Sequence, residues 1–240
     1  MLAAKNSQEL MKSLASIDIS VPARTAGRTS EHTERYSVCR LLSTLSKSNH
    51  VSYPLSLKKR ERPDYLLHCN GTDIGIEITE ATSQDYCEYV AAAEKDSTVT
   101  FLEPGHFRHG SRVSRNMKNQ LLKQTKLTSP GWAGDEVEKE WLNYVKDAIL
   151  QKTAKAQKPE FEKFNENWLL VYDNTPTMFM HKELLTPYLE QLWSSVSVHQ
   201  FNSIFVETSW LEKNSGTALP VIVALSQNSV NYFPLENLWP

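Results

Sequence analysis

The sequence predicts an α/β fold in which one domain spans residues 1–240. Segments with the apolar spacing of helices alternate with short strand-like segments, which is typical of a mixed sheet flanked by helices. Asn70-Gly71 lies between two apolar runs, and this dipeptide is the strongest short signal for a β-hairpin. The chain has 240 residues with 40% hydrophobic content, which suits the core of one domain.

The first part of the chain is predicted to be mainly helical. Residues 1–17 are expected to form a short amphipathic helix, and residues 20–30 are expected to form a linker. A second helix is predicted at 31–48, because Ser30 is a suitable N-cap. The apolar residues of this helix fall on one face: Val38, Leu41, Leu42 and Leu45. A short strand around Tyr53–Leu57 is left open, because the pattern of that segment is ambiguous.

The rest of the chain alternates between strands and helices. The predicted segments are strands at 64–69 and 74–79, a helix at 80–97, a long loop at 103–134 with a helical piece near 112–126, a helix at 135–157, a strand at 168–172, a helix at 181–198, and strands at 203–207 and 221–225. This order places one helix before three strands, and another helix before the next strand. A mixed sheet with helices on its faces is the expected result.

The predicted hairpin brings two carboxylates together. A two-residue turn places Cys69 opposite Thr72, and therefore places Asp64 opposite Glu77 on one face of the hairpin. Directly opposed side chains have Cβ atoms roughly 4.5–5.5 Å apart, so the two carboxylates repel each other. A divalent cation would explain the pair, since Mg²⁺ takes one or two protein carboxylates together with water and phosphates. The alternative is a solvated acidic face on an edge hairpin.

A motif that includes these acids resembles the signature of the PD-(D/E)xK nuclease superfamily. Pro63-Asp64 is followed after 12 residues by Glu77-Ile78-Thr79, so Thr79 stands where the motif has lysine. The resemblance implies a restriction-endonuclease-like αβββαβ core over residues 31–175. It also implies that Asp64, Glu77 and the carbonyl of Ile78 bind Mg²⁺ or Mn²⁺ beside a scissile phosphate. Residues 1–30 would then precede the core, and residues 176–240 would form a C-terminal extension packed on it.

A lysine could come from the helix at 135–157 instead. On a helical wheel, Lys152 and Lys155 fall on the same stripe as Trp141 and Ala148, which are expected to face the sheet. The superfamily sometimes moves its lysine to this helix, so the resemblance makes Lys152 the first candidate and Lys155 the second. Alternatively, both lysines lie past the core and extend their ammonium groups into water.

An acid on the first core helix often joins the metal site in this superfamily. Glu34 is therefore a candidate third acid, and Glu31 is the next candidate, because both point to the same side as the apolar face of their helix. The alternative is that both are ordinary acids near a helix N-terminus, where the helix dipole favours negative charge.

A basic segment follows the hairpin. The window from Pro104 to Gly134 has no Asp or Glu, and it contains six basic residues: Arg108, Arg112, Arg115, Lys118, Lys123 and Lys126. Such a segment suits a phosphate backbone, so Arg108, Arg112, Arg115 and Lys118 are candidate nucleic-acid-binding residues. The alternative is a solvated surface. His106 and His109 in the same window lack a nearby Cys or acid that would complete a zinc site.

These observations predict a metal-dependent endonuclease that hydrolyses DNA phosphodiester bonds. The alternative is a catalytically inactive protein of the same fold that acts as a nucleic-acid-binding or assembly module. Thr79 favours the alternative, and the presence of both acids favours the enzyme. The three cysteines are scattered, which predicts a reducing, cytoplasmic compartment. No apolar run reaches the ~18 residues of a membrane span, and the resemblance leaves a homodimer open.

Overall fold

The computed structural model of the chain describes residues 2–195, 200–211, 217–227, 229–236 and 238–239. In this part of the chain, eight strands form one mixed sheet, and their order across the sheet is their order in the sequence. The strands are β1 (Leu2–Ala4), β2 (Leu55–Lys59), β3 (Tyr65–Cys69), β4 (Thr72–Thr82), β5 (Glu166–Asn174), β6 (Ser203–Leu211), β7 (Ala218–Ser226) and β8 (Ser229–Pro234). The predicted α/β class, with a mixed sheet flanked by helices, is confirmed.

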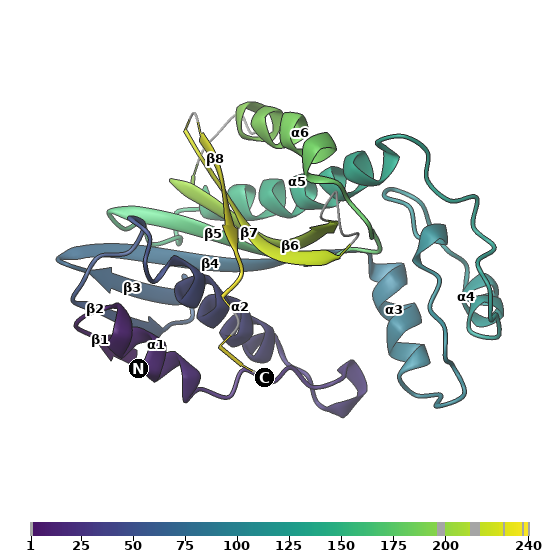
Figure 1. Cartoon of the computed structure of the whole chain (residues 1–240), viewed down its shortest axis with the longest axis horizontal. Coiled ribbons are helices and arrows are strands. Elements are labelled where there is room, and N and C mark those ends of the chain that lie inside the picture. The colour runs from purple at the N-terminus through teal and green to yellow at the C-terminus, as the bar shows by residue number, and fades with distance from the viewer. Residues whose placement is uncertain (1, 196–199, 212–216, 228, 237, 240) are drawn as a thin grey trace.

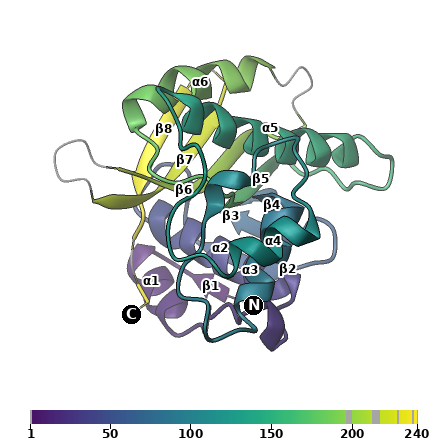
Figure 2. The same cartoon turned by 90° about the vertical axis from the view of Figure 1, so that its right-hand side faces the viewer.

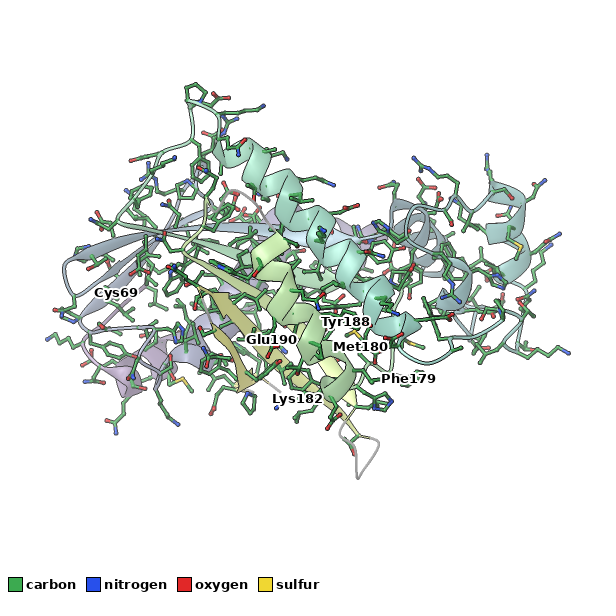
Figure 3. The ribbon with its side chains drawn as sticks, turned by 90° about the horizontal axis from the view of Figure 1, so that it is seen from above. Cys69, Phe179, Met180, Lys182, Tyr188 and Glu190 are labelled. Carbon is green, nitrogen blue, oxygen red and sulfur yellow. The ribbon has the colours of Figure 1, made fainter. Side chains whose placement is uncertain are left out.

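Helices cover both faces of the sheet (Figure 1). One face carries α1 (Ser7–Ala15) and α2 (Ser30–Leu45), and the other carries α5 (Glu136–Ala156) and α6 (Lys182–Ser195). Figure 3 looks down on α5 and α6, which lie side by side, and Tyr188 of α6 donates a hydrogen bond to Asp135 at the start of α5. The sheet is therefore buried on both sides over its central strands.

The hairpin of β3 and β4 has the register that the sequence predicts. Its turn residues have positive φ angles, 45° at Asn70 and 87° at Gly71, as the tight type I′ turn requires. Cys69 faces Thr72, and the ladder continues in the same register to Tyr65 opposite Ile76. Asp64 lies one residue before β3, at the next position of this register. The two-residue turn at Asn70-Gly71 therefore determines which residues face each other at the far end of the hairpin, where Asp64 lies.

The central strands β4, β5 and β6 run parallel to one another. Parallel neighbours require a long connection from one end of the sheet to the other. Between β4 and β5 this connection contains α3 (Gln84–Ala93), the short helix α4 (Arg115–Leu121) and α5. As a result, α5 packs back across β4 and β5, with its buried residues facing the sheet as the helical wheel predicts.

Two large apolar clusters fill the space on either side of the sheet. The cluster under α2 includes Leu41 and Leu42 packed with Ile76 of β4. The cluster under α5 includes Trp141 and Val145, which pack with Leu169 of β5. A third and smaller cluster is formed by Tyr89, Phe107 and Leu121. Figure 2 looks onto the lobe of α3 and α4 that surrounds this third cluster, beyond the end of β4.

Several predicted boundaries were wrong. Residues 2–4 form a strand rather than the start of a helix, because they pair with β2. Helix α2 already includes Ser30, and Thr29 is its N-cap. The helix predicted at 80–97 is shorter, because β4 continues to Thr82 and Ser83 caps α3. Residues 196–198 of the helix predicted at 181–198 lie outside the described residues. Strand β8 was not predicted.

Two further expectations concern the environment of the chain. Cys39, Cys69 and Cys87 are each buried as free thiols, as the scattered spacing predicts. Among the described residues, no helix is both long enough and apolar enough to cross a membrane.

Candidate active site

Three elements bring charged side chains into one cleft. Asp64 comes from the turn before β3, Glu77 from the middle of β4, and Lys152 from the last turns of α5. The cleft has a volume of about 350 Å³. Its lining residues are Glu61, Arg62, Asp64, Glu77, Lys152, Lys155, Lys158, Glu160 and Phe161. The two acids that the hairpin brings together thus meet a lysine that is distant in the sequence.

Asp64 bonds to the backbone of the neighbouring strand. Its Oδ2 accepts a hydrogen bond of 2.7 Å from the N–H of Ile78. This N–H is free for Asp64 because the ladder between β3 and β4 ends at the pair Tyr65 and Ile76. In a strand, the N–H and C=O of one residue point to the same side, so the carbonyl of Ile78 also faces the side of Asp64.

Glu77 is buried in the middle of β4 and forms an ion pair. Its side chain is only 11% exposed, and its Oε2 lies 2.5 Å from Nζ of Lys152, which is 18% exposed. A carboxylate inside a strand is costly to bury without a partner, and Lys152 supplies that partner. The inward direction of Lys152 matches the helical wheel, and the ammonium group does not extend into water at the helix end.

The pKa of the Asp64 carboxyl group is raised. Burial, followed by repulsion from Glu77, raises the pKa of Asp64 to about 6. The hydrogen bond from Ile78 and the charge of Lys152 act in the opposite direction but do not cancel this rise. Two carboxylates therefore share one ammonium group, and the site favours one additional positive charge.

The donor set fits a small hard cation. Asp64, Glu77 and the Ile78 carbonyl offer oxygen atoms only, which are the ligands that Mg²⁺ and Mn²⁺ prefer. Among the described residues, no group of three or more His, Cys, Asp or Glu side chains could hold a metal ion. Mg²⁺ needs only one or two protein carboxylates when water and phosphate oxygens complete its shell, so the pair is sufficient.

The other residues of the predicted site lie at its margins. Thr79 is half-buried and, two residues after Glu77 on β4, faces the same side of the sheet. Lys155 is exposed and lines the cleft. Glu34 does not line it, because its carboxylate pairs with Lys59 at 2.5 Å, although its charge contributes to the raised pKa of Asp64. Glu31 is exposed in the first turn of α2.

Sequence reasoning missed two cations of the cleft. Arg62 lines it directly before the Pro63-Asp64 motif, and Lys158 lines it just beyond the end of α5. The position of Arg62 next to the motif is a signal that could have identified it. No sequence signal identifies Lys158, because only the packing of α5 on the sheet brings the segment after it to the cleft.

The basic window divides into residues with different environments. Arg108 and Arg112 line a second cavity next to the cleft. Lys118 instead pairs with Asp85 at 3.1 Å and with Glu88 at 2.6 Å, which holds α4 against α3. Arg115 is exposed on α4. The four predicted nucleic-acid-binding residues thus do not form one uniform surface.

A side chain at position 75 is predicted to destabilise the fold, because Gly75 lies against Phe164 and Pro63, the residue before Asp64. A Cβ at position 75 would lie 2.8 Å from Phe164 and 3.0 Å from the ring of Pro63. We expect Gly75→Ala to lower the free energy of unfolding by about 1–3 kcal/mol, measured by urea denaturation. Phe164→Ala in the same chain should recover part of this loss. Additive effects of the two substitutions would contradict the contact.

Asp64→Asn is predicted to stabilise the chain in EDTA at neutral pH. Because the pKa of Asp64 is raised to about 6, the folded state binds a proton more tightly than the unfolded state. Stability from this group is therefore full at pH below about 4 and is lost as pH rises through about 6. Removal of the charge should add roughly 1–2 kcal/mol at pH 8 and almost nothing at pH 4, after allowance for solvent screening. Urea unfolding at the two pH values checks this, and equal effects at both would contradict it.

No protein-family model, curated protein or solved structure matches this chain.

Proposed function

We propose that the chain is a metal-dependent nuclease that hydrolyses DNA phosphodiester bonds. The observation that carries this proposal is the convergence of Asp64, Glu77 and Lys152 in one cleft. Paired carboxylates that bind a cation, with an ammonium group beside them, suit a reaction in which negative charge increases on a phosphate.

The order of elements supports the same proposal. Helix α2, strands β2, β3 and β4, helix α5 and strand β5 follow the αβββαβ order that the PD-(D/E)xK resemblance implies, with α3 and α4 inserted between β4 and α5. Strand β3 is antiparallel to both β2 and β4, and β5 is parallel to β4. In this proposal, the chain has a restriction-endonuclease-like core. The strands β6 to β8 and helix α6 extend this core at its C-terminal side.

Each residue of the cleft has a proposed role. Asp64, Glu77 and the Ile78 carbonyl would hold Mg²⁺ or Mn²⁺, and such an ion would supply Lewis-acid chemistry to a phosphodiester and to water when bound. Lys152 would orient the attacking water and offset the charge of the phosphate. Thr79 offers only a hydroxyl group at the usual lysine position, so Lys152 would replace that lysine. Arg62, Lys155 and Lys158 would attract the DNA backbone to the cleft.

A non-catalytic role is the second candidate. The observation that favours it is the short bond between Lys152 and Glu77, which already neutralises one of the two acids. A protein that only binds DNA or assembles on it would retain this ion pair in all states. The expected cytoplasmic location and the homodimer remain predictions under both proposals.

Metal binding and DNA cleavage separate the two proposals. The nuclease proposal expects Mg²⁺ or Mn²⁺ to raise the melting temperature, since a ligand of the folded state stabilises it by mass action. It also expects cleavage of supercoiled plasmid and of linear DNA in Mg²⁺ but not in EDTA. DNA binding without any cleavage in either metal would support the non-catalytic proposal instead.

A further inference from the structure

A second cavity lies beside the cleft of the candidate active site. It has a volume of about 440 Å³, and most of its lining residues are polar. Its lining comes from the end of β4, the start of α3, the loop before α4, and α5. The residues that matter for its chemistry are Glu80, Asp85, Asp147, Arg108, His109 and Arg112.

The cavity and the active-site cleft are both lined by α5. Gln151 lines the cavity, and Lys155 lines the cleft. These residues are four positions apart, so they are neighbours on one side of the helix. From Asp147 in the cavity to Lys155 in the cleft the helix rises ~12 Å, at about 1.5 Å per residue. A duplex strand rises about 3.4 Å per nucleotide, so the distance corresponds to roughly three to four nucleotides.

Each acid of the cavity is already paired with a basic group. Glu80 lies 3.1 Å from Arg24 and 3.6 Å from Arg28, both of which precede α2. Asp85 pairs with Lys118 at 3.1 Å. Asp147 lies 2.8 Å from Nε2 of His109. Glu80 and Asp85 are therefore compensated by Arg and Lys side chains before any ligand enters, and Asp147 is held by its hydrogen bond with His109.

Two arginines of the cavity, Arg108 and Arg112, then stand against one acid, Asp147, that has no Lys or Arg partner among the described residues. Arg108 lies over the ring of Trp132 and donates a hydrogen bond to the Gly131 carbonyl, so its guanidinium group is held in place. Arg112 is exposed at the mouth of the cavity, and its charge acts on Asp85. Within the described part of the chain, no carboxylate forms an ion pair with Arg112. An anion would complete this arrangement.

His109 is held between Arg108 and Arg112 in a fixed orientation. Its ring bonds to Asp147 and makes an edge contact with Tyr144, at 5.0 Å between centroids. Its backbone N–H donates to Glu140. Gly110 follows with a φ of +73°, which turns the loop back so that Arg112 returns to the cavity. These contacts hold the loop in place, so Arg112 extends from an ordered segment.

We propose that this cavity is a subsite for one backbone phosphate of the bound DNA, within about four nucleotides of the scissile phosphate, and that Arg112 contacts that phosphate while the fixed ring of His109 holds the loop that carries Arg112. This proposal rests on the proposed nuclease function, because the cavity adjoins the carboxylate cleft. A phosphate in the subsite fixes the position of the strand in the cleft, as backbone contacts do in other protein–DNA complexes.

The experiment is a scan of single phosphates by fluorescence anisotropy in EDTA, where the proposed hydrolysis does not proceed. Short duplex probes carry one uncharged methylphosphonate at each phosphate position in turn, numbered from the probe end, so the scan needs no known cleavage site. The wild-type chain should lose about 5–10-fold in affinity at one of these positions. Arg112→Gln should bind the unmodified probe about 5–10-fold more weakly and show no further loss at that position. Its salt dependence should fall by about 0.9 in the log–log slope.

A matched control removes one positive charge elsewhere. Lys12→Gln changes the net charge equally on α1, on the other face of the sheet, and should keep the wild-type scan. If Arg112→Gln retains the same position-specific loss as the wild type, the subsite proposal is wrong even when the chain cleaves DNA. If the scan behaves as expected but no metal supports cleavage, the subsite stands and the nuclease proposal fails. A chain that does not bind the probe overturns both.

Discussion

Asp64→Asn and Glu77→Gln are each expected to abolish Mg²⁺-dependent DNA cleavage while the chain remains folded. Both substitutions keep the size of the side chain and remove the charge that would bind the cation. A metal ion contributes several kcal/mol to such a transition state, so the rate should fall by about 10³-fold or more. Initial rates on plasmid and linear DNA, together with circular dichroism and the urea midpoint, measure both parts of the prediction.

The two variants should differ in stability. The amide of Asp64→Asn can still accept the hydrogen bond from Ile78, and the repulsion from Glu77 is removed. Glu77→Gln instead leaves Lys152 without its carboxylate partner, which should lower the unfolding free energy by about 2–3 kcal/mol. If both variants lose activity while Asp64→Asn is more stable and Glu77→Gln is less stable than the wild type, the loss of activity arises from the site and not from unfolding.

Asp73→Asn is the matched control for these variants. Asp73 lies four residues before Glu77 on β4 and on the same side of the strand, but its side chain is 44% exposed and pairs with His68. We expect its cleavage rate to stay within twofold of the wild-type rate. Wild-type rates in Asp64→Asn or Glu77→Gln would mean that the metal-site assignment is wrong.

Lys152→Met is expected to reduce the cleavage rate by on the order of 10²-fold or more. Methionine keeps the aliphatic length that packs beside Glu77 and removes the ammonium group. Removal of one pre-organised donor from a transition-state site has an effect of this size. Stability should fall as well, because Glu77 then loses its buried partner. Single-turnover rates at saturating DNA separate this chemical effect from weaker binding.

Two lysines of the same helix provide the comparison. Lys155→Met tests the second candidate, which is exposed at the edge of the cleft and should mainly affect DNA affinity. Lys146→Met lies on the polar side of α5 and should leave both the rate and the affinity unchanged. If Lys152→Met cleaves DNA at the wild-type rate, then Lys152 does not replace the lysine that Thr79 lacks, and the non-catalytic proposal gains support.

The sequence alone predicted the hairpin and the proximity of its acids. This was possible because the geometry is local: a two-residue turn at Asn70-Gly71 fixes the register, and the register fixes which side chains are opposed. The inward face of α5 was predictable for the same reason, since the apolar stripe around Trp141 follows from the helical period. The short edge strand β1 was not predictable, because a segment of three residues carries no period of its own.

Only the tertiary structure decided which lysine meets the acids. Lys152 and Glu77 are 75 residues apart, and their contact depends on the length of the connection through α3 and α4 and on the rotation of α5 over β4. The same packing brings Lys158 to the cleft and Arg112 to the second cavity. The raised pKa of Asp64 also arises at this stage, because burial and the nearby charge of Glu77 exist only once the chain is folded. The sequence pattern of one helix or hairpin determines the relative positions of the side chains within that element. Charged side chains from different elements come together only when the apolar faces of those elements have packed.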